Sequence, residues 1–279
     1  MVENIPLITH HHDGLTIEGY SRAAVQTCWR VNELKLLFDV GVQPWDFMGT
    51  PTLFISHAHL DHIAALPAYV SRRRMMKMDP PTIYLPDSAV DDAWDMLQTF
   101  RRLDRGPMPC ELVGLLPGDE IECGREYMVV AVPTRHTITS LGFIVYHRRH
   151  KLKPEYTSLS GPEIRDLKLA GKEVTTELRV PIFAYTGDTS PPGLDNNEAF
   201  YEAKILVSEL TFVAPEHRKE LIHKHGHMHI DDYRKRADRF QNELVIAGHL
   251  STRYHDRQVQ TMAERGLPGL LDGRMKLWL

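Results

Sequence analysis

The sequence has few cysteines and no long apolar run. Three cysteines in 279 residues, Cys28, Cys110 and Cys123, are too few and too scattered for a disulfide framework. No apolar stretch approaches the roughly 18 residues that a membrane helix needs. The N-terminus lacks a basic start followed by an apolar core, so we expect no signal peptide. These absences predict a reduced, cytoplasmic protein that does not enter a membrane.

The sequence also lacks internal repeats, low-complexity linkers and a strong excess of one charge. The net charge of −4 argues against binding nucleic acid over the whole surface. Local basic clusters are candidates for nucleic-acid contact, with a solvated helix face or loop as the alternative: residues 71–77, 100–105 and 147–153. We expect one domain over residues 1–279. Residues 1–14 form its lead-in segment, in which His10, His11 and His12 are expected to be exposed loop residues.

Apolar, β-branched segments alternate with segments of helical spacing, which predicts an α/β fold with helices outside the sheet. The expected strands are residues 34–41, 52–56, 82–86, 127–133, 141–147, 181–188, 203–210 and 242–249. The expected helices are residues 61–75, 88–103, 163–170, 195–203, 230–241 and 256–265. Four strands end near a metal-binding residue type: His57, His136, Asp188 and His249. Active sites of open α/β sheets lie outside the carboxyl ends of strands, so we expect these four residues to converge.

The segment LFISHAHLDHIAALPAYV, residues 53–70, contains the most distinctive motif of the chain. On an extended segment, residues two apart point to the same side, so His57 and His59 can bind one metal ion. Asp61 and His62 follow at the start of a helix and can face a second ion. Imidazole nitrogen and carboxylate oxygen suit zinc at about 2.0–2.2 Å. A lone histidine after a strand is more often a satisfied polar residue, but the H-x-H-x-D-H spacing favours a metal site.

This spacing, with the distant His, Asp and His, resembles the metallo-β-lactamase superfamily. The other segments that carry this resemblance are FDVG (38–41), RHTITSLGFIVY (135–146), AYTGDT (184–189) and GHLSTRY (248–254). Three segments narrow it to the ribonuclease Z family of tRNA 3′-processing endonucleases, in its short form: SELTF (208–212), HGHMHIDD (225–232) and residues 151–175. The resemblance covers nearly the whole chain from about Leu15. It implies a metallo-β-lactamase fold, an αββα four-layer sandwich with two mixed sheets.

The resemblance implies two zinc ions per subunit, with Mn²⁺ or another divalent metal as the alternative. The ligands that it implies for one ion are His57, His59 and His136. Those for the other ion are Asp61, His62 and His249, with Asp188 between the two. A carboxylate such as Asp188 can bridge both ions because it has two oxygens.

The resemblance also assigns catalytic and substrate-binding roles. Asp61 would act on the nucleophilic water, His227 would stabilise charge or protonate the departing 3′ oxygen, and Glu209 would orient His227. The family's His-Glu-Ala-Thr motif reads SELT (208–211) here. In the family's His-Ser-Thr pattern, His229 fills a position that normally carries a hydroxyl, so His225 and His229 are alternatives to His227. Arg253 and Tyr254 would contact substrate or support the site, with a structural ion pair as the alternative for Arg253.

The implied function is hydrolysis of the phosphodiester at the 3′ end of precursor tRNA by a homodimer in which one subunit binds the RNA and the other cuts it. The chain between His136 and Asp188 lacks the long Gly/Pro-rich basic insertion that many members use as an RNA-binding arm. Two alternatives remain. One is a hydrolase of a small phosphodiester, ester or thioester, because the same metal site serves many chemistries. The other is a non-catalytic RNA-binding relative, which the complete ligand set argues against.

Overall fold

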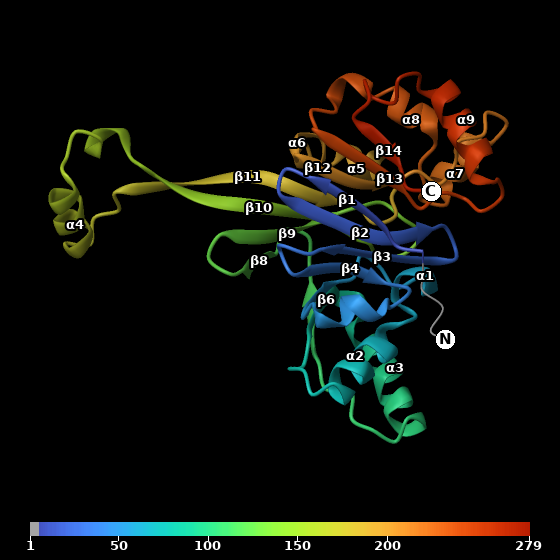
Figure 1. Cartoon of the computed structure of the whole chain (residues 1–279), viewed down its shortest axis with the longest axis horizontal. Helices are drawn as coiled ribbons and strands as arrows, with labels where there is room; N and C mark the ends of the chain where they lie inside the picture. Colours follow the sequence, from blue (N-terminus) through green and yellow to red (C-terminus); the bar gives the residue numbers. More distant parts are fainter. Residues whose placement is uncertain (1–5) are drawn as a thin grey trace.

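Two seven-stranded sheets lie face to face at the centre of the molecule (Figure 1). The computed structural model describes residues 6–279. The first sheet has the order β1-β2-β3-β4-β5-β6-β7, antiparallel from β1 to β4 and parallel from β4 to β7. Its strands are β1 Ile8–His12, β2 Leu15–Arg22, β3 Gln26–Val31, β4 Leu36–Val40, β5 Thr52–Phe54, β6 Thr82–Pro86 and β7 Glu111–Leu115.

The second sheet repeats this mixed pattern with the order β14-β13-β12-β11-β10-β9-β8. It is antiparallel from β8 to β11 and parallel from β11 to β14. Its strands are β8 Glu120–Cys123, β9 Tyr127–Pro133, β10 Leu141–Leu152, β11 Thr175–Tyr185, β12 Ile205–Glu209, β13 Leu244–Gly248 and β14 Met275–Leu277.

Helices cover the outer face of each sheet (Figure 1). Those beside the first sheet are α1 Leu60–Ile63, α2 Leu66–Met75 and α3 Val90–Leu103. Those beside the second sheet are α5 Pro191–Asp195, α6 Ala199–Glu202, α7 Lys219–Lys224, α8 Ile230–Arg234 and α9 Asp256–Gly266. The predicted αββα sandwich with two mixed sheets is therefore confirmed. Within residues 6–279, no helix is both long enough and apolar enough to cross a membrane.

Three buried apolar clusters fill the three interfaces between the four layers. The central strands β4, β12 and β13 are buried along their whole length because both faces of each sheet are covered there. Successive residues of β5 illustrate this: Leu53 packs toward the helices of the first sheet, and Phe54 packs between the sheets. Between the sheets, Phe38 stacks on Phe183 with ring centres 5.2 Å apart, which joins the two halves of the chain.

Most expected elements are present, with several corrections. Helix 61–75 is split into α1 and α2, because Pro67 lacks the N–H that a continuous helix would need and is instead placed in the first turn of α2, where no such donor is required. His10, His11 and His12 are not loop residues, because they belong to β1, which pairs with β2. Residues 8–12 of the expected lead-in segment are thus part of the first sheet, and residues 1–5 lie outside the described residues. That residues 1–279 form one domain stays a prediction.

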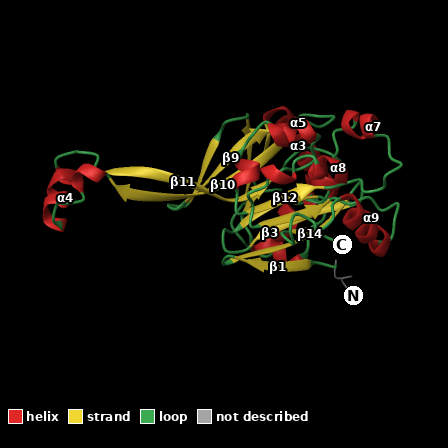
Figure 2. Cartoon of the chain, turned by 90° about the horizontal axis from the view of Figure 1, so that it is seen from above, coloured by secondary structure: helices red, strands yellow, loops and turns green. Residues whose placement is uncertain are grey.

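A long arm projects from the second sheet (Figure 2). It consists of the outer parts of β10 and β11, which pair as far as Leu152 and Thr175, and of α4 Gly161–Leu169 at the tip. The sequence led us to expect no long Gly/Pro-rich insertion here, and the arm is instead an extended β-hairpin. The alternative for the basic cluster 147–153 was a solvated helix face or loop, but residues 147–152 are strand because they continue the ladder of β10 with β11.

Candidate metal centre

The predicted ligands converge where strands end. His57 follows β5, His136 follows β9, Asp188 follows β11 and His249 follows β13. The turn into α1 passes close to the end of β4. A Cβ added at Gly41 would lie 1.7 Å from the carbonyl oxygen of Asp61, so only glycine leaves room for this turn.

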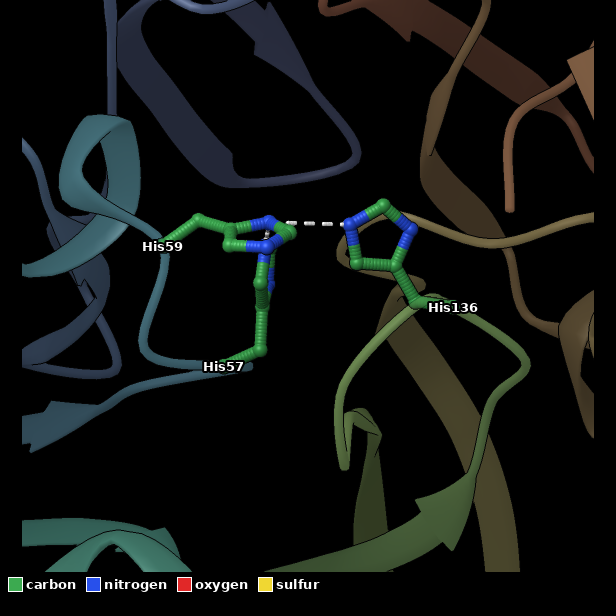
Figure 3. A group of neighbouring side chains, drawn as sticks. All are labelled: His57, His59 and His136. Atoms are coloured by element: carbon green, nitrogen blue, oxygen red, sulfur yellow. Dashed lines mark hydrogen bonds between the residues drawn. The ribbon is translucent and has the colours of Figure 1, made fainter. Parts of the chain in front are cut away.

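Three histidines form the first group (Figure 3). His57 Nε2 lies 3.1 Å from His59 Nδ1, and His136 Nε2 lies 3.0 Å from the same atom. The three rings come from two loops, after β5 and after β9, and point toward one another. These nitrogens are close enough to share one ion.

Asp61, His62 and His249 form the second group. His62 Nε2 and His249 Nε2 are 3.4 Å apart, and Asp61 Oδ2 lies 3.3 Å from His249 Nε2. Asp188 lies between the two groups. Its Oδ1 is 3.4 Å from His62 Nε2, and its Oδ2 is 3.8 Å from His136 Nε2. The structure therefore brings all seven predicted ligands together in two groups that share Asp188.

Buried hydrogen bonds orient the histidines in the N-terminal half. His62 Nδ1 donates to Asp39 Oδ2 over 2.7 Å. His57 Nδ1 donates to Ser56 Oγ over 3.0 Å, and Ser56 Oγ donates to Asp39 Oδ2 over 2.8 Å. Because the Nδ1 protons are held in this way, both Nε2 atoms present lone pairs to the centre. Asp39 has a left-handed backbone with φ of 58°, a strained geometry that is often found at functional sites.

A similar relay orients the C-terminal half. His249 Nδ1 donates to Thr211 Oγ1 over 3.0 Å, and Thr211 Oγ1 donates to Glu209 Oε2 over 2.6 Å. Glu209 Oε1 also accepts from His227 Nδ1 over 3.1 Å. His249 itself has a φ of 57°. One buried carboxylate thus holds both a candidate ligand and a histidine beside the centre.

His136 is held by the backbone instead. Its Nδ1 donates to the carbonyl oxygen of Gly226 over 3.0 Å. Gly226 has a φ of 73°, and a Cβ there would lie 2.5 Å from His136 Nδ1. Glycine at this position is therefore needed both for the backbone geometry and for the close approach of His136.

The geometry and chemistry of these groups fit divalent cations. Nitrogens that both present lone pairs repel each other at 3.0–3.4 Å, unless a cation lies between them. Two ligands at about 2.0–2.1 Å from a tetrahedral zinc ion lie about 3.3 Å from each other, which matches these separations. No ligand beyond histidine and carboxylate is needed to complete either group, so the residues present suit zinc or a similar metal.

The protonation states also suit metal binding, which requires neutral imidazole and ionised carboxylate. Burial lowers the pKa of His57 well below its usual range. Burial raises the pKa of Asp188, but His249 and His62 outweigh it and hold that pKa well below its usual range. His62 differs: burial lowers its pKa, yet Asp188 and Asp39 raise it well above the usual value. A bound cation would take the place of the proton that these carboxylates favour on His62.

His227 lies beside the centre and His229 does not. The side chain of His227 is 19% exposed and lines the cleft over the centre. Burial lowers its pKa, but the charge of Glu209 and the hydrogen bond to it raise the pKa to about 9. His229 is buried, where its Nδ1 accepts from the Asp231 amide and caps α8, and its Nε2 donates to the Ala214 carbonyl oxygen. His229 thus accepts a hydrogen bond from the first turn of α8, as the hydroxyl of a serine or threonine N-cap does in many helices.

The cleft over the centre has a volume of about 570 Å³. Arg253 lines this cleft. Among residues 6–279, Arg253 has no acidic partner, so the structure does not show the ion pair that was its alternative role. Tyr254 is not among the residues that line the cleft, and its hydroxyl donates to Glu216 Oε1 over 3.1 Å. That Tyr254 contacts substrate or supports the site stays a prediction.

The sequence did not identify the residues that orient the candidate ligands through hydrogen bonds. These residues are Asp39, Ser56, Thr211 and Gly226. Each lies within a segment that the resemblance already drew on or beside a predicted ligand, as Asp39 does in FDVG and Thr211 in SELTF. Residue type alone does not distinguish these residues from ordinary turn or strand residues.

Two mixed sheets with a His/Asp centre at their strand ends define a metallo-β-lactamase-type protein, and the model of the family described as Beta-lactamase superfamily domain matches residues 42–250. The chain is 37% identical to tRNase Z TRZ1 of Arabidopsis thaliana over 265 residues, which is 94% of each chain. It is 34% identical to the chloroplastic tRNase Z TRZ2 of the same plant over 89% of this chain and 71% of that one.

The crystal structure of the short form of human tRNase Z has the same fold, with a TM-score of 0.55 at 19% identity over 86% of this chain and 87% of that one. The chain belongs to the tRNase Z, or ribonuclease Z, family. The family and the His/Asp centre together imply a divalent metal.

Proposed function

We propose that this protein is a metal-dependent endoribonuclease that removes the 3′ trailer from precursor tRNA. The observation that carries the proposal is the identity to tRNase Z over 94% of the chain, in a protein whose His227–Glu209 pair lies beside the His/Asp centre. We further propose a cytoplasmic location, which agrees with three cysteines that are all free thiols.

The proposed centre holds two Zn²⁺ ions per subunit, with Mn²⁺ as the alternative. One group of ligands is His57, His59 and His136, and the other is Asp61, His62 and His249. Asp188 is shared between them. When bound, such ions neutralise the charge of a phosphodiester and lower the pKa of a water molecule to about 7.

The residues around the centre orient the reaction. Asp61 would accept a hydrogen bond from the attacking water, and the backbone amide of Ala24 holds the carboxylate by donating to Asp61 Oδ2 over 2.9 Å. Glu209 holds the Nδ1 proton of His227, which leaves Nε2 to donate to the departing 3′ oxygen. A general acid placed in this way contributes about 10²–10⁴-fold to the rate.

The arm is the proposed RNA-binding element outside the cleft. Side chains alternate along β10, so Arg149 and Lys151 share one face, and neither has an acidic partner among residues 6–279. On the opposite face, Arg148 pairs with Glu122 and Arg179 with Glu120. In the basic cluster 71–77, Arg73 is buried against the carbonyl oxygen of Met48 and is not available to RNA. The face of the arm with Arg149 and Lys151 suits phosphate contacts.

The direction of the arm supports a homodimer. β10 starts beside the centre, where the Leu141 amide donates to the Ser56 carbonyl oxygen, and it runs for 12 residues away from it. At about 3.3 Å per residue, its far end lies about 40 Å from the centre of its own subunit. An RNA held by the arm of one subunit is therefore better placed for the cleft of another.

The decisive experiment is incubation of the purified protein with a labelled precursor tRNA, with and without a chelator. We expect a single cut after the discriminator base, no cut with the chelator, and recovery with added Zn²⁺. Sedimentation at the assay concentration checks the dimer. Hydrolysis of small phosphodiesters without any precursor tRNA cleavage would contradict the proposal.

A further inference from the structure

Phe212 is an aromatic side chain at the edge of the candidate centre that has no role so far. It follows Thr211 and lines the same cleft as His227. Its backbone is fixed on both sides, because its amide donates to the Met228 carbonyl oxygen and its carbonyl accepts from the Ile230 amide. The ring is half-buried, with its centre 6.1 Å from that of His227. Phe212 is thus a rigid apolar surface next to the candidate general acid.

Arg253 lies on this ring without packing closely against it. The guanidinium carbon is 5.8 Å from the ring centre of Phe212, near the limit of about 6 Å for a cation–π contact. Arg253 is exposed and has no acidic partner among residues 6–279. The two side chains therefore form an open pair, aromatic on one side and cationic on the other, at the mouth of the cleft.

We propose that Phe212 and Arg253 hold the base of the nucleotide on the 5′ side of the cut. Aromatic rings and guanidinium planes are the groups on which unpaired RNA bases stack. The proposal rests on the proposed function, in which His227 donates to the departing 3′ oxygen. That oxygen belongs to the 5′ nucleotide, so the base next to His227 is the base of this nucleotide. Stacking tolerates any of the four bases, which suits a position that varies among RNAs.

The test compares precursor tRNAs that lack a single base. One substrate has an abasic ribose on the 5′ side of the cut, and the other has it on the 3′ side. For the wild-type protein we expect kcat/KM to fall by about 5–100-fold with the 5′ abasic substrate, which is the range that stacking of one base supplies. We expect a clearly smaller loss with the 3′ abasic substrate. This comparison needs no protein variant.

Variants then assign the effect to the ring. In Phe212→Leu we expect the intact and 5′ abasic substrates to be cleaved at equal rates, and in Phe212→Trp we expect the difference to return. Trp45→Leu is the matched control, because Trp45 is also exposed and has Arg72 6.0 Å from its ring, but it lies outside the cleft. It should keep the wild-type difference.

The outcomes separate this proposal from the proposed function. If the wild type cuts intact precursor tRNA but cuts the 5′ abasic substrate equally well, base stacking is wrong and the endonuclease function stands. The same holds if Phe212→Leu keeps the full wild-type difference. If the wild type does not cut intact precursor tRNA, the proposed function fails, and the stacking proposal fails with it.

Discussion

The two halves of the centre hold their histidines in the same way but differ in what their buried carboxylate does. In the N-terminal half, Ser56 connects His57 to Asp39, which also holds His62. In the C-terminal half, Thr211 connects His249 to Glu209. Asp39 thus serves two candidate ligands.

Glu209 serves one candidate ligand and one histidine, His227, that lines the cleft. In the proposed function, the N-terminal hydrogen bonds would therefore serve metal binding alone. The C-terminal ones would connect metal binding to the proposed proton donor. With these proposed roles, loss of Asp39 would affect metal affinity alone, whereas loss of Glu209 would affect metal affinity and proton transfer together.

The largest expected effect is loss of the first group. His59→Ala removes the nitrogen that lies within 3.1 Å of both His57 and His136. We expect RNA cleavage to fall to background and the metal content of the purified protein to fall as well. Cleavage assays with metal analysis of the same sample check both. Full metal content in an inactive protein would contradict the role of His59 as a ligand.

The next effect isolates the proton donor. His227→Ala should lower RNA cleavage by about 10²–10⁴-fold, because it removes the general acid. Its metal content should remain near that of the wild type. The control substrate is methyl p-nitrophenyl phosphate, whose leaving group needs no proton and whose hydrolysis should change little. Full RNA cleavage by His227→Ala, with loss in His225→Ala, would move the role to His225.

The relays themselves give the direct test of the comparison. Asp39→Asn should weaken metal affinity by about 10–100-fold, the usual cost of removing a hydrogen-bond partner of a ligand, and excess Zn²⁺ should restore cleavage. Glu209→Gln should weaken metal affinity in the same range, but excess Zn²⁺ should not restore cleavage, because the substitution removes the charge that raises the pKa of His227 and keeps it protonated. Titration of activity with Zn²⁺ measures both. Equal recovery of the two variants would show that the halves do not differ.

The smallest effect concerns a histidine that lies outside the cleft. His229→Ala should lower the free energy of unfolding by about 1–3 kcal/mol, since it removes the cap of α8 and leaves the Ala214 carbonyl without its donor. His229→Asn should lose less, because asparagine is a good N-cap. Denaturant unfolding gives both values. Cleavage per folded molecule should be nearly unchanged in either variant, in contrast to His227→Ala.

The fold class was predicted correctly, and the candidate ligands could be selected from the sequence, because both leave local signals. Strands buried on two faces read as apolar runs, and H-x-H-x-D-H is compact enough to recognise. The edge strands were harder. β1 and β2 contain polar residues such as His10 and Glu18, whose side chains lie on the partly exposed faces of the sheet, so their strand character depends on pairing.

The residues that hold the ligands could not be read in the same way. Asp39 and Thr211 act through one hydrogen bond to a histidine that is distant in sequence, and only the fold brings the two together. The arm was missed for a similar reason. Its strands are stabilised by each other rather than by an apolar core, so the basic residues 147–152 gave no strand signal of their own.

The construction of the arm also has a consequence for how it can change. Between Tyr146 and Leu152, each residue of β10 lies opposite one residue of β11 without a bulge. Two residues added to each strand would lengthen the hairpin by about 7 Å and leave every side chain on its original face. Insertions of two residues in each strand could therefore change the distance between the tip of the arm and the candidate centre in fixed steps, while the residues of the centre stay unchanged.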